Sequence, residues 1–141
     1  MPTYLIVANQ TLGGAELIDH VRERLQGRPC SFYLVVPATP PKEHLTWTEG
    51  EAHAIAEHRL AEGIDRLRAL GADVDGEVGD ASPMLAIDDA LRNRTVDSII
   101  VTTLPMGLSR WLKLSLPDRL ARKYDVPVTH IVVEPASSAA R

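Results

Sequence analysis

Cysteine is almost absent from this chain. Its 141 residues include one, Cys30, so the sequence offers neither an internal disulfide nor a cysteine-based zinc cage. A lone cysteine is typical of a reducing compartment, and we expect a cytoplasmic protein. Cys30 stands at the start of a predicted strand, where we expect it to pack as a small apolar side chain.

Other absences exclude whole classes of function. No apolar run approaches the roughly 20 residues that span a bilayer, and no basic segment precedes an apolar one at the start, so we expect neither a membrane span nor a signal peptide. The net charge of -4 argues against nucleic acid as a partner.

Catalytic and metal motifs are missing too. The chain has no P-loop, no G-x-G-x-x-G and no G-x-S-x-G, and His53 and His58 lack the spacing of the H-E-x-x-H metal motif. Asp88 and Asp89 are predicted to lie on the solvated side of a helix rather than to form an acid/base pair. We therefore predict no enzyme and no metal site, with weak ATP hydrolysis the one activity left open.

The composition is that of one globular domain, with 45% hydrophobic and 24% charged residues. We expect the domain to span residues 1–134 and a flexible tail to follow at 135–141. Short apolar runs alternate with segments of helical period. Strands are predicted at 4–8, 32–36, 73–78, 98–102 and 126–133, and helices around 17–25, 52–70, 84–91 and 108–124.

This alternation predicts an α/β fold, a five-stranded parallel sheet of order 3-2-1-4-5 with helices on both faces. In such sheets ligands bind beyond the carboxyl ends of the strands, where the order reverses, here between the first and fourth strands. The candidate ligand residues at that edge are Ala8, Asn9, Gln10, Thr11, Gly13, Gly14, Pro37, Thr102 and Thr103. Gly13 and Gly14 form either an anion-binding nest before a helix or merely a permissive turn.

Three segments carry a family resemblance: Gly79-Asp80 followed by Ser82-Pro83, the strand 96–101, and the stretch from Ser115-Leu116-Pro117 to Val126-Pro127-Val128. Together they resemble the universal stress protein family over nearly the whole chain. The resemblance implies the same fold, a stress-response role and, for ATP-binding members, the motif G-x2-G-x9-G-S/T after the fourth strand.

That glycine motif is largely lost here. Its glycine positions fall on Thr102, Pro105 and Leu114, and only Ser115 matches. The aspartate that the family carries after strand one is also absent. Because glycines let backbone N–H groups close on phosphates, we expect no ATP binding of the usual kind and no required cofactor.

Basic residues stand near the lost motif. Arg110 and Lys113 could supply charge to a phosphate in place of the glycines, or they could belong to a solvated helix face. Trp111 and Trp47 could each cover a ligand, meet a partner or pack in the core, and the sequence leaves these alternatives open.

The resemblance also implies a homodimer formed through the last strand, with Val128, Ile131 and Val133 at or near the interface. An independent argument agrees, because a long apolar edge strand is one that soluble proteins avoid exposing. The sequence thus predicts a non-catalytic stress-response or regulatory module that has a degenerate nucleotide site and an unknown protein partner. The alternative is an ATP-binding protein with weak or no hydrolysis, which uses Thr102, Thr103, Arg110 and Ser115.

Overall fold

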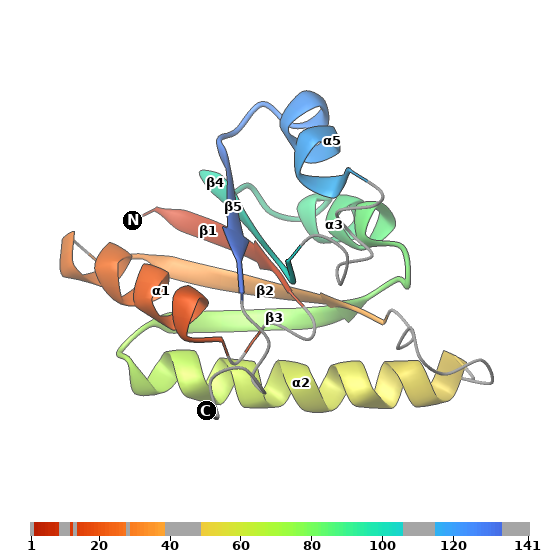
Figure 1. The fold of residues 1–141 in the computed structure, drawn as a ribbon, viewed down its shortest axis with the longest axis horizontal. Helices are drawn as coiled ribbons and strands as arrows, with labels where there is room; N and C mark the ends of the chain where they lie inside the picture. Colours follow the sequence, from red (N-terminus) through yellow and green to blue (C-terminus); the bar gives the residue numbers. More distant parts are fainter. Residues whose placement is uncertain are drawn as a thin grey trace.

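Five parallel strands form one sheet in the order β3-β2-β1-β4-β5, as the sequence predicts (Figure 1). The computed structural model describes residues 2–8, 12, 14–27, 29–38, 49–105 and 115–133. The elements are β1 (Thr3–Val7), α1 (Ala15–Gly27), β2 (Ser31–Pro37), α2 (Glu49–Ala69), β3 (Asp73–Gly79), α3 (Pro83–Leu91), β4 (Ser98–Thr103), α5 (Leu116–Lys123) and β5 (Val128–Val132).

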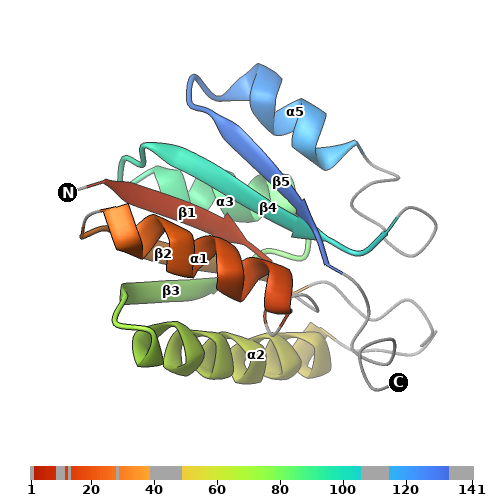
Figure 2. The same ribbon diagram turned by 60° about the vertical axis from the view of Figure 1, so that its left-hand side comes forward.

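Helices cover both faces of the sheet, with α1 and α2 on one side and α3 and α5 on the other (Figure 2). Each face has its own core. Ile6 and Ile100 point into the core under α1 and α2, while their neighbours Leu5 and Ile99 point into the core under α3 and α5. Because successive side chains alternate between faces and both faces are covered, the inner positions of β1 and β4 are mostly apolar, with Thr102 and Thr103 as buried polar residues near the end of β4.

The segment 79–83 joins β3 to α3 at very short range. An added Cβ on Gly79 would lie 2.5 Å from the Cβ of Ala86, so no other residue fits there without a shift of α3. Asp80 Oδ1 accepts the backbone N–H of Ser82 at 2.9 Å, and Pro83 occupies the first turn. Ser82 is the residue at the helix cap, but its side chain makes no capping hydrogen bond.

The ends of other elements test further predictions. Gly71 lies two residues after the end of α2 and has a φ of +94°, a conformation that glycine adopts freely. Pro117 lies in the first turn of α5, as predicted, whereas residues 108–114 of the predicted helix lie outside the described part. The last strand is shorter than predicted, because 126–127 and 133 flank β5 rather than belong to it.

One prediction about α3 is wrong. Asp88 is half-buried rather than solvated, because its carboxylate accepts a hydrogen bond from the Tyr124 hydroxyl and a 2.7 Å bond from Lys123 Nζ. These contacts join α3 to the end of α5.

Among the described helices, none is long and apolar enough to cross a membrane.

Tyr33 ties β2 to the edge strand β3. Its hydroxyl donates to Glu77 Oε1 at 2.5 Å, and the Arg94 guanidinium carbon lies 3.5 Å from the ring centroid. Burial and the Glu77 carboxylate raise the pKa of Tyr33 to about 12, although Arg94 acts in the opposite direction.

We predict that the protein loses stability as the pH rises from about 10 to about 12. The unfolded phenol ionises near its ordinary pKa of 10.0, whereas the folded one stays protonated to about 12, so the unfolded state releases its proton first. Urea unfolding across this range should show the loss, and Tyr33→Phe should flatten it. An identical slope in both proteins would contradict this account.

We also predict that Gly79→Ala destabilises the fold by about 1–3 kcal/mol, because the new methyl overlaps α3. Gly27→Ala is the matched control, since an added Cβ there meets nothing within 4 Å. Its stability should stay unchanged or rise by up to about 1 kcal/mol. Chemical denaturation measures the free energy of unfolding of both variants. Equal values would contradict the explanation that a side chain at position 79 collides with Ala86 of α3.

Candidate functional site

The carboxyl ends of β1 and β4 meet at the predicted switch point. Ala8 follows β1 and is fully buried, and Thr102, near the end of β4, is 0% exposed. The Thr102 hydroxyl donates to the carbonyl oxygen of Val7 across the two strands at 3.4 Å. Its side chain therefore braces the pair of strands from inside the core under α1 and α2.

Thr103 points to the opposite face and is 2% exposed. Its Oγ1 lies 2.7 Å from Nε2 of His130 on β5, a hydrogen bond in which either atom can donate. The sequence analysis missed His130 as a member of this edge. The signal for it is a single histidine in a mostly apolar strand, where His130 pairs in register with Val101, two residues before the end of β4.

Backbone hydrogen bonds fasten the rest of this edge. The Ala8 N–H donates to the Val35 carbonyl at 3.2 Å, and the Ala38 N–H, after Pro37, donates to the Gly79 carbonyl at 3.1 Å. Pro37 itself is buried as the last residue of β2. Ala8, Pro37, Thr102 and Thr103 thus lie at the predicted edge, although all four are buried.

Three positions of the glycine motif lie in the described part of the chain, namely Thr102, Pro105 and Ser115. Pro105 follows β4 and is half-buried, and a proline has no N–H to offer a phosphate. Ser115, which precedes α5, is exposed and has a φ of 56° and a ψ of 39°, the left-handed conformation that usually requires glycine. Its side chain makes no capping bond to the helix.

Several predicted ligand residues lie outside the described part of the chain: Asn9, Gln10, Thr11, Gly13 and Arg110, together with Lys113, Leu114, Trp47 and Trp111. Gly14 is described, and its carbonyl accepts the N–H of Ile18 at 3.2 Å in the first turn of α1. A helix therefore begins immediately after the glycine pair, as predicted.

The described switch-point residues are chemically neutral. Ala8, Thr102, Thr103, Leu104 and Pro105 supply no carboxylate and no cation. Across the described ranges, no three His, Cys, Asp or Glu side chains are grouped so that they could hold a metal ion. This part of the edge can pack against an uncharged group, but it cannot by itself neutralise a phosphate.

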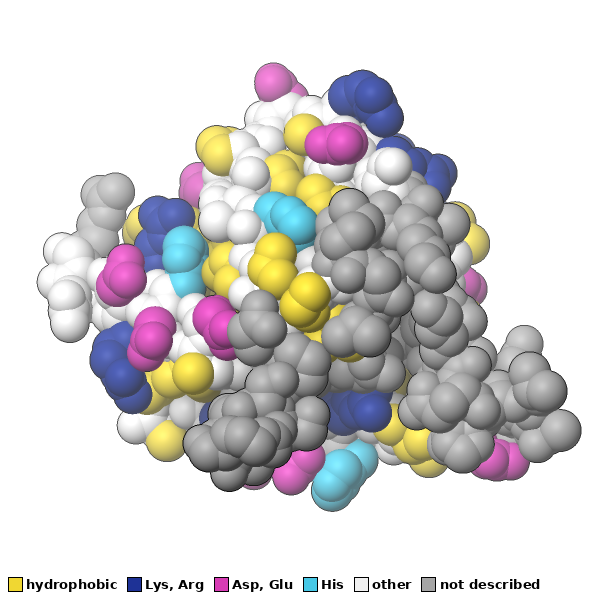
Figure 3. All heavy atoms as spheres, viewed as in Figure 1, with side chains coloured by type: hydrophobic (Ala, Val, Ile, Leu, Met, Phe, Trp, Pro, Cys, Tyr) yellow, Lys and Arg dark blue, Asp and Glu magenta, His cyan; other side chains and the backbone are white. Residues whose placement is uncertain are grey.

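The strand assigned to the dimer interface, β5, lies at one edge of the sheet. Val128 packs into the core under α3 and α5, Ile131 packs into the core under α1 and α2, and Val133 is only 3% exposed. Val132 is 42% exposed, and hydrophobic side chains show on the surface over β5 in Figure 3. The interface stays a prediction, with Val132 as an exposed apolar residue that the sequence analysis did not choose.

Comparison with known proteins places this geometry in a class. No protein-family model and no curated protein matches the chain in sequence. Among solved structures, a universal stress protein in complex with cAMP aligns with a TM-score of 0.55 at 19% identity, covering 92% of this chain and 96% of the other. A universal stress protein from Archaeoglobus fulgidus aligns with a TM-score of 0.59 at 16% identity, covering 93% of each chain.

Each of these structures aligns with this parallel α/β chain over nearly the full length of both chains. The fold of the chain is that of the universal stress proteins, which confirms the fold that the sequence resemblance implies. At such low identities the likeness establishes the fold and leaves the binding properties to the residues themselves.

Proposed function

We propose that this chain is a non-catalytic, universal-stress-protein-like regulatory module with a degenerate nucleotide site, which acts through contact with a partner protein. That contact is either constitutive or gated by a ligand at the β1/β4 switch. One observation carries the proposal: where a phosphate needs free donors, the described edge has the buried, bonded Thr102 and the N–H-free Pro105.

The size of the effect can be gauged from hydrogen bonding. A hydrogen bond to a charged group contributes about 1.5–3 kcal/mol, so one missing donor weakens binding roughly 10- to 150-fold. From this one donor alone, a site of about 1 μM affinity weakens to about 10–150 μM, and each further lost donor weakens it again by a similar factor. The neutral character of the described switch residues supports the same conclusion, because none of them offsets this loss with charge.

The absence of catalysis rests on the same residues. Hydrolysis of a phosphoanhydride needs a group that orients water and cations that stabilise the transition state. The described switch residues provide hydroxyls that are already hydrogen-bonded, to the Val7 carbonyl and to His130. An output through protein contact needs neither group.

Adenine-nucleotide binding is the second candidate. A neighbour with this fold was solved in complex with cAMP, which favours it. A cyclic monophosphate carries one charge and needs fewer donors than a triphosphate, so it tolerates a reduced loop better. Arg110, Thr102, Thr103 and Ser115 would then take the place of the missing glycines.

Calorimetric titration of the purified chain separates the two candidates. We expect no heat of binding with ATP and magnesium, or with cAMP, up to about 1 mM ligand. Micromolar binding of either nucleotide, lost in Arg110→Ala, would overturn the proposal in favour of the second candidate.

A gain-of-function variant sharpens this titration. Pro105→Gly restores a backbone donor and should tighten ATP binding by about 10-fold or more. Pro127→Gly, at the opposite end of the sheet, is the matched control and should gain nothing. Equal responses from the two variants would argue against a site degraded at position 105.

The proposed module is a homodimer joined through β5. An edge lysine blocks strand pairing between copies, so Val132→Lys should turn the dimer into a monomer. Leu85→Lys is the control, because Leu85 is also an exposed apolar residue, at 52%, but lies on α3. Sedimentation equilibrium measures both variants, and a wild-type monomer or an unaffected Val132→Lys dimer would contradict the interface.

A further inference from the structure

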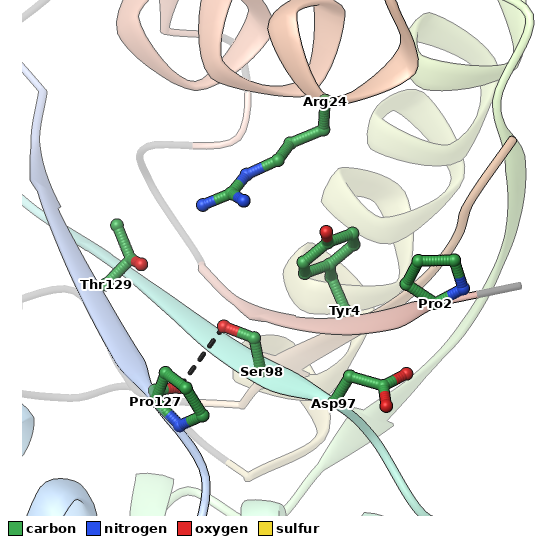
Figure 4. A pocket seen from close by; sticks show the side chains of 7 residues that line it. All are labelled: Pro2, Tyr4, Arg24, Asp97, Ser98, Pro127 and Thr129. Carbon is green, nitrogen blue, oxygen red and sulfur yellow. Dashed lines mark hydrogen bonds between the residues drawn. The ribbon is translucent and has the colours of Figure 1, made fainter. Parts of the chain in front are cut away.

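A second candidate site lies at the opposite end of the sheet from the switch point. Here the starts of β1, β4 and β5 and the last turn of α1 surround an open hollow of about 460 Å³ (Figure 4). Its lining residues are Pro2, Tyr4, Arg24, Asp97, Ser98, Pro127 and Thr129. Its volume falls within the range of small-molecule sites, roughly 300–1,000 Å³.

Arg24 is held in place on two sides. Its Nε donates to Nε2 of His20 at 3.2 Å, one helical turn earlier. Its guanidinium carbon lies 5.1 Å from the centroid of the Tyr4 ring, and that ring stacks on Phe32 with centroids 5.4 Å apart. Burial and the nearby Arg24 charge lower the pKa of His20, against the opposing effect of Glu23, and this favours the neutral imidazole that can accept the Arg24 bond.

These contacts use the Nε edge and one face of the guanidinium. In the described part of the chain, the two terminal nitrogens of Arg24 make no hydrogen bond or ion pair, and neither does the Thr129 hydroxyl. Figure 4 shows the Arg24 side chain reaching from α1 over the hollow toward Thr129 on β5. The hollow therefore has a fixed cation and a hydroxyl as available donors.

The remaining polar groups of the hollow are already bonded. Asp97 Oδ2 accepts the backbone N–H of Thr3 at 2.8 Å, and the Ser98 hydroxyl donates to the Pro127 carbonyl at 3.2 Å. Asp97 also places a negative charge at the other side of the hollow from Arg24 (Figure 4). A ligand with several negative charges is repelled by that carboxylate, whereas a singly charged one can stay near Arg24.

We propose that this hollow binds a small monocarboxylate, with the terminal nitrogens of Arg24 gripping both carboxylate oxygens and Thr129 donating a further hydrogen bond. The planar guanidinium fork matches a carboxylate in geometry as well as in charge. The apolar part of the ligand lies along the Tyr4 ring and Pro127. This site is separate from the switch point, so it stands whether or not nucleotides bind there.

Nuclear magnetic resonance titration with sodium acetate, at constant ionic strength set by chloride, tests the site in the intact chain. Saturable shifts should appear at the backbone amides of Tyr4, Ser98 and Thr129. Arg24→Gln should weaken acetate binding about 10-fold or more, and Thr129→Val should weaken it less. Arg22→Gln is the control, because Arg22 is exposed on the same helix and pairs with Asp19 at 3.6 Å, and should bind acetate as wild type does.

Three results would overturn the proposal. The first is the absence of saturable shifts, and the second is equal acetate affinity in wild type and Arg24→Gln. The third is tighter binding of inorganic phosphate than of acetate, which would reject a carboxylate as the ligand. If Arg24→Gln does not fold, Thr129→Val decides the question. Acetate affinity equal to that of the wild type in this variant would show that the Thr129 hydroxyl does not bind the carboxylate, and would overturn the proposal.

Discussion

Burial of β1 and β4 on both faces is the constraint on which the rest of the molecule depends. Residues 5–7 and 99–102 have no exposed surface, so the strands' inner positions hold almost only apolar side chains. The polar exception, Thr102, is accommodated because its hydroxyl has a carbonyl partner. Polar groups that are available to a ligand therefore lie at the two ends of the strands and not in the interior of the sheet.

The two ends differ in their readiness to hold an anion. At the carboxyl end, the described hydroxyls brace strands against one another, and the chain runs on through a proline. At the amino end, a guanidinium is positioned by His20 and Tyr4 with donors to spare. In this fold class, ligands usually bind at the carboxyl ends of the strands. Among the described residues, that end has fewer available hydrogen-bond donors than the amino end.

The architecture was predictable because it depends on patterns within short segments. Segments with strand and helix periodicity alternate along the chain, and the rules for parallel crossovers then predict the strand order. The acidic run at 73–78 indicates that β3 is an edge strand. The site was predictable only in part. Ala8, Pro37, Thr102 and Thr103 were placed at the right edge, but their burial depends on packing by helices distant in sequence. The Thr103–His130 bond, the Asp88–Tyr124 bond and the hollow at Arg24 each join residues from distant segments, and no local pattern specifies such pairs.

The two outer strands of the sheet also differ in charge. β3 carries Asp73, Asp75 and Glu77 along its length, so two such edges repel each other, whereas β5 carries none of these charges. Each molecule therefore has one edge fit to pair with a copy of itself. A twofold pair formed there uses up that edge on both molecules and turns the acidic edges outward. In the proposed dimer both β5 edges are used, and the outward-facing acidic β3 edges would repel one another, so the charge difference between the outer strands disfavours joining one dimer to the next through two β3 edges.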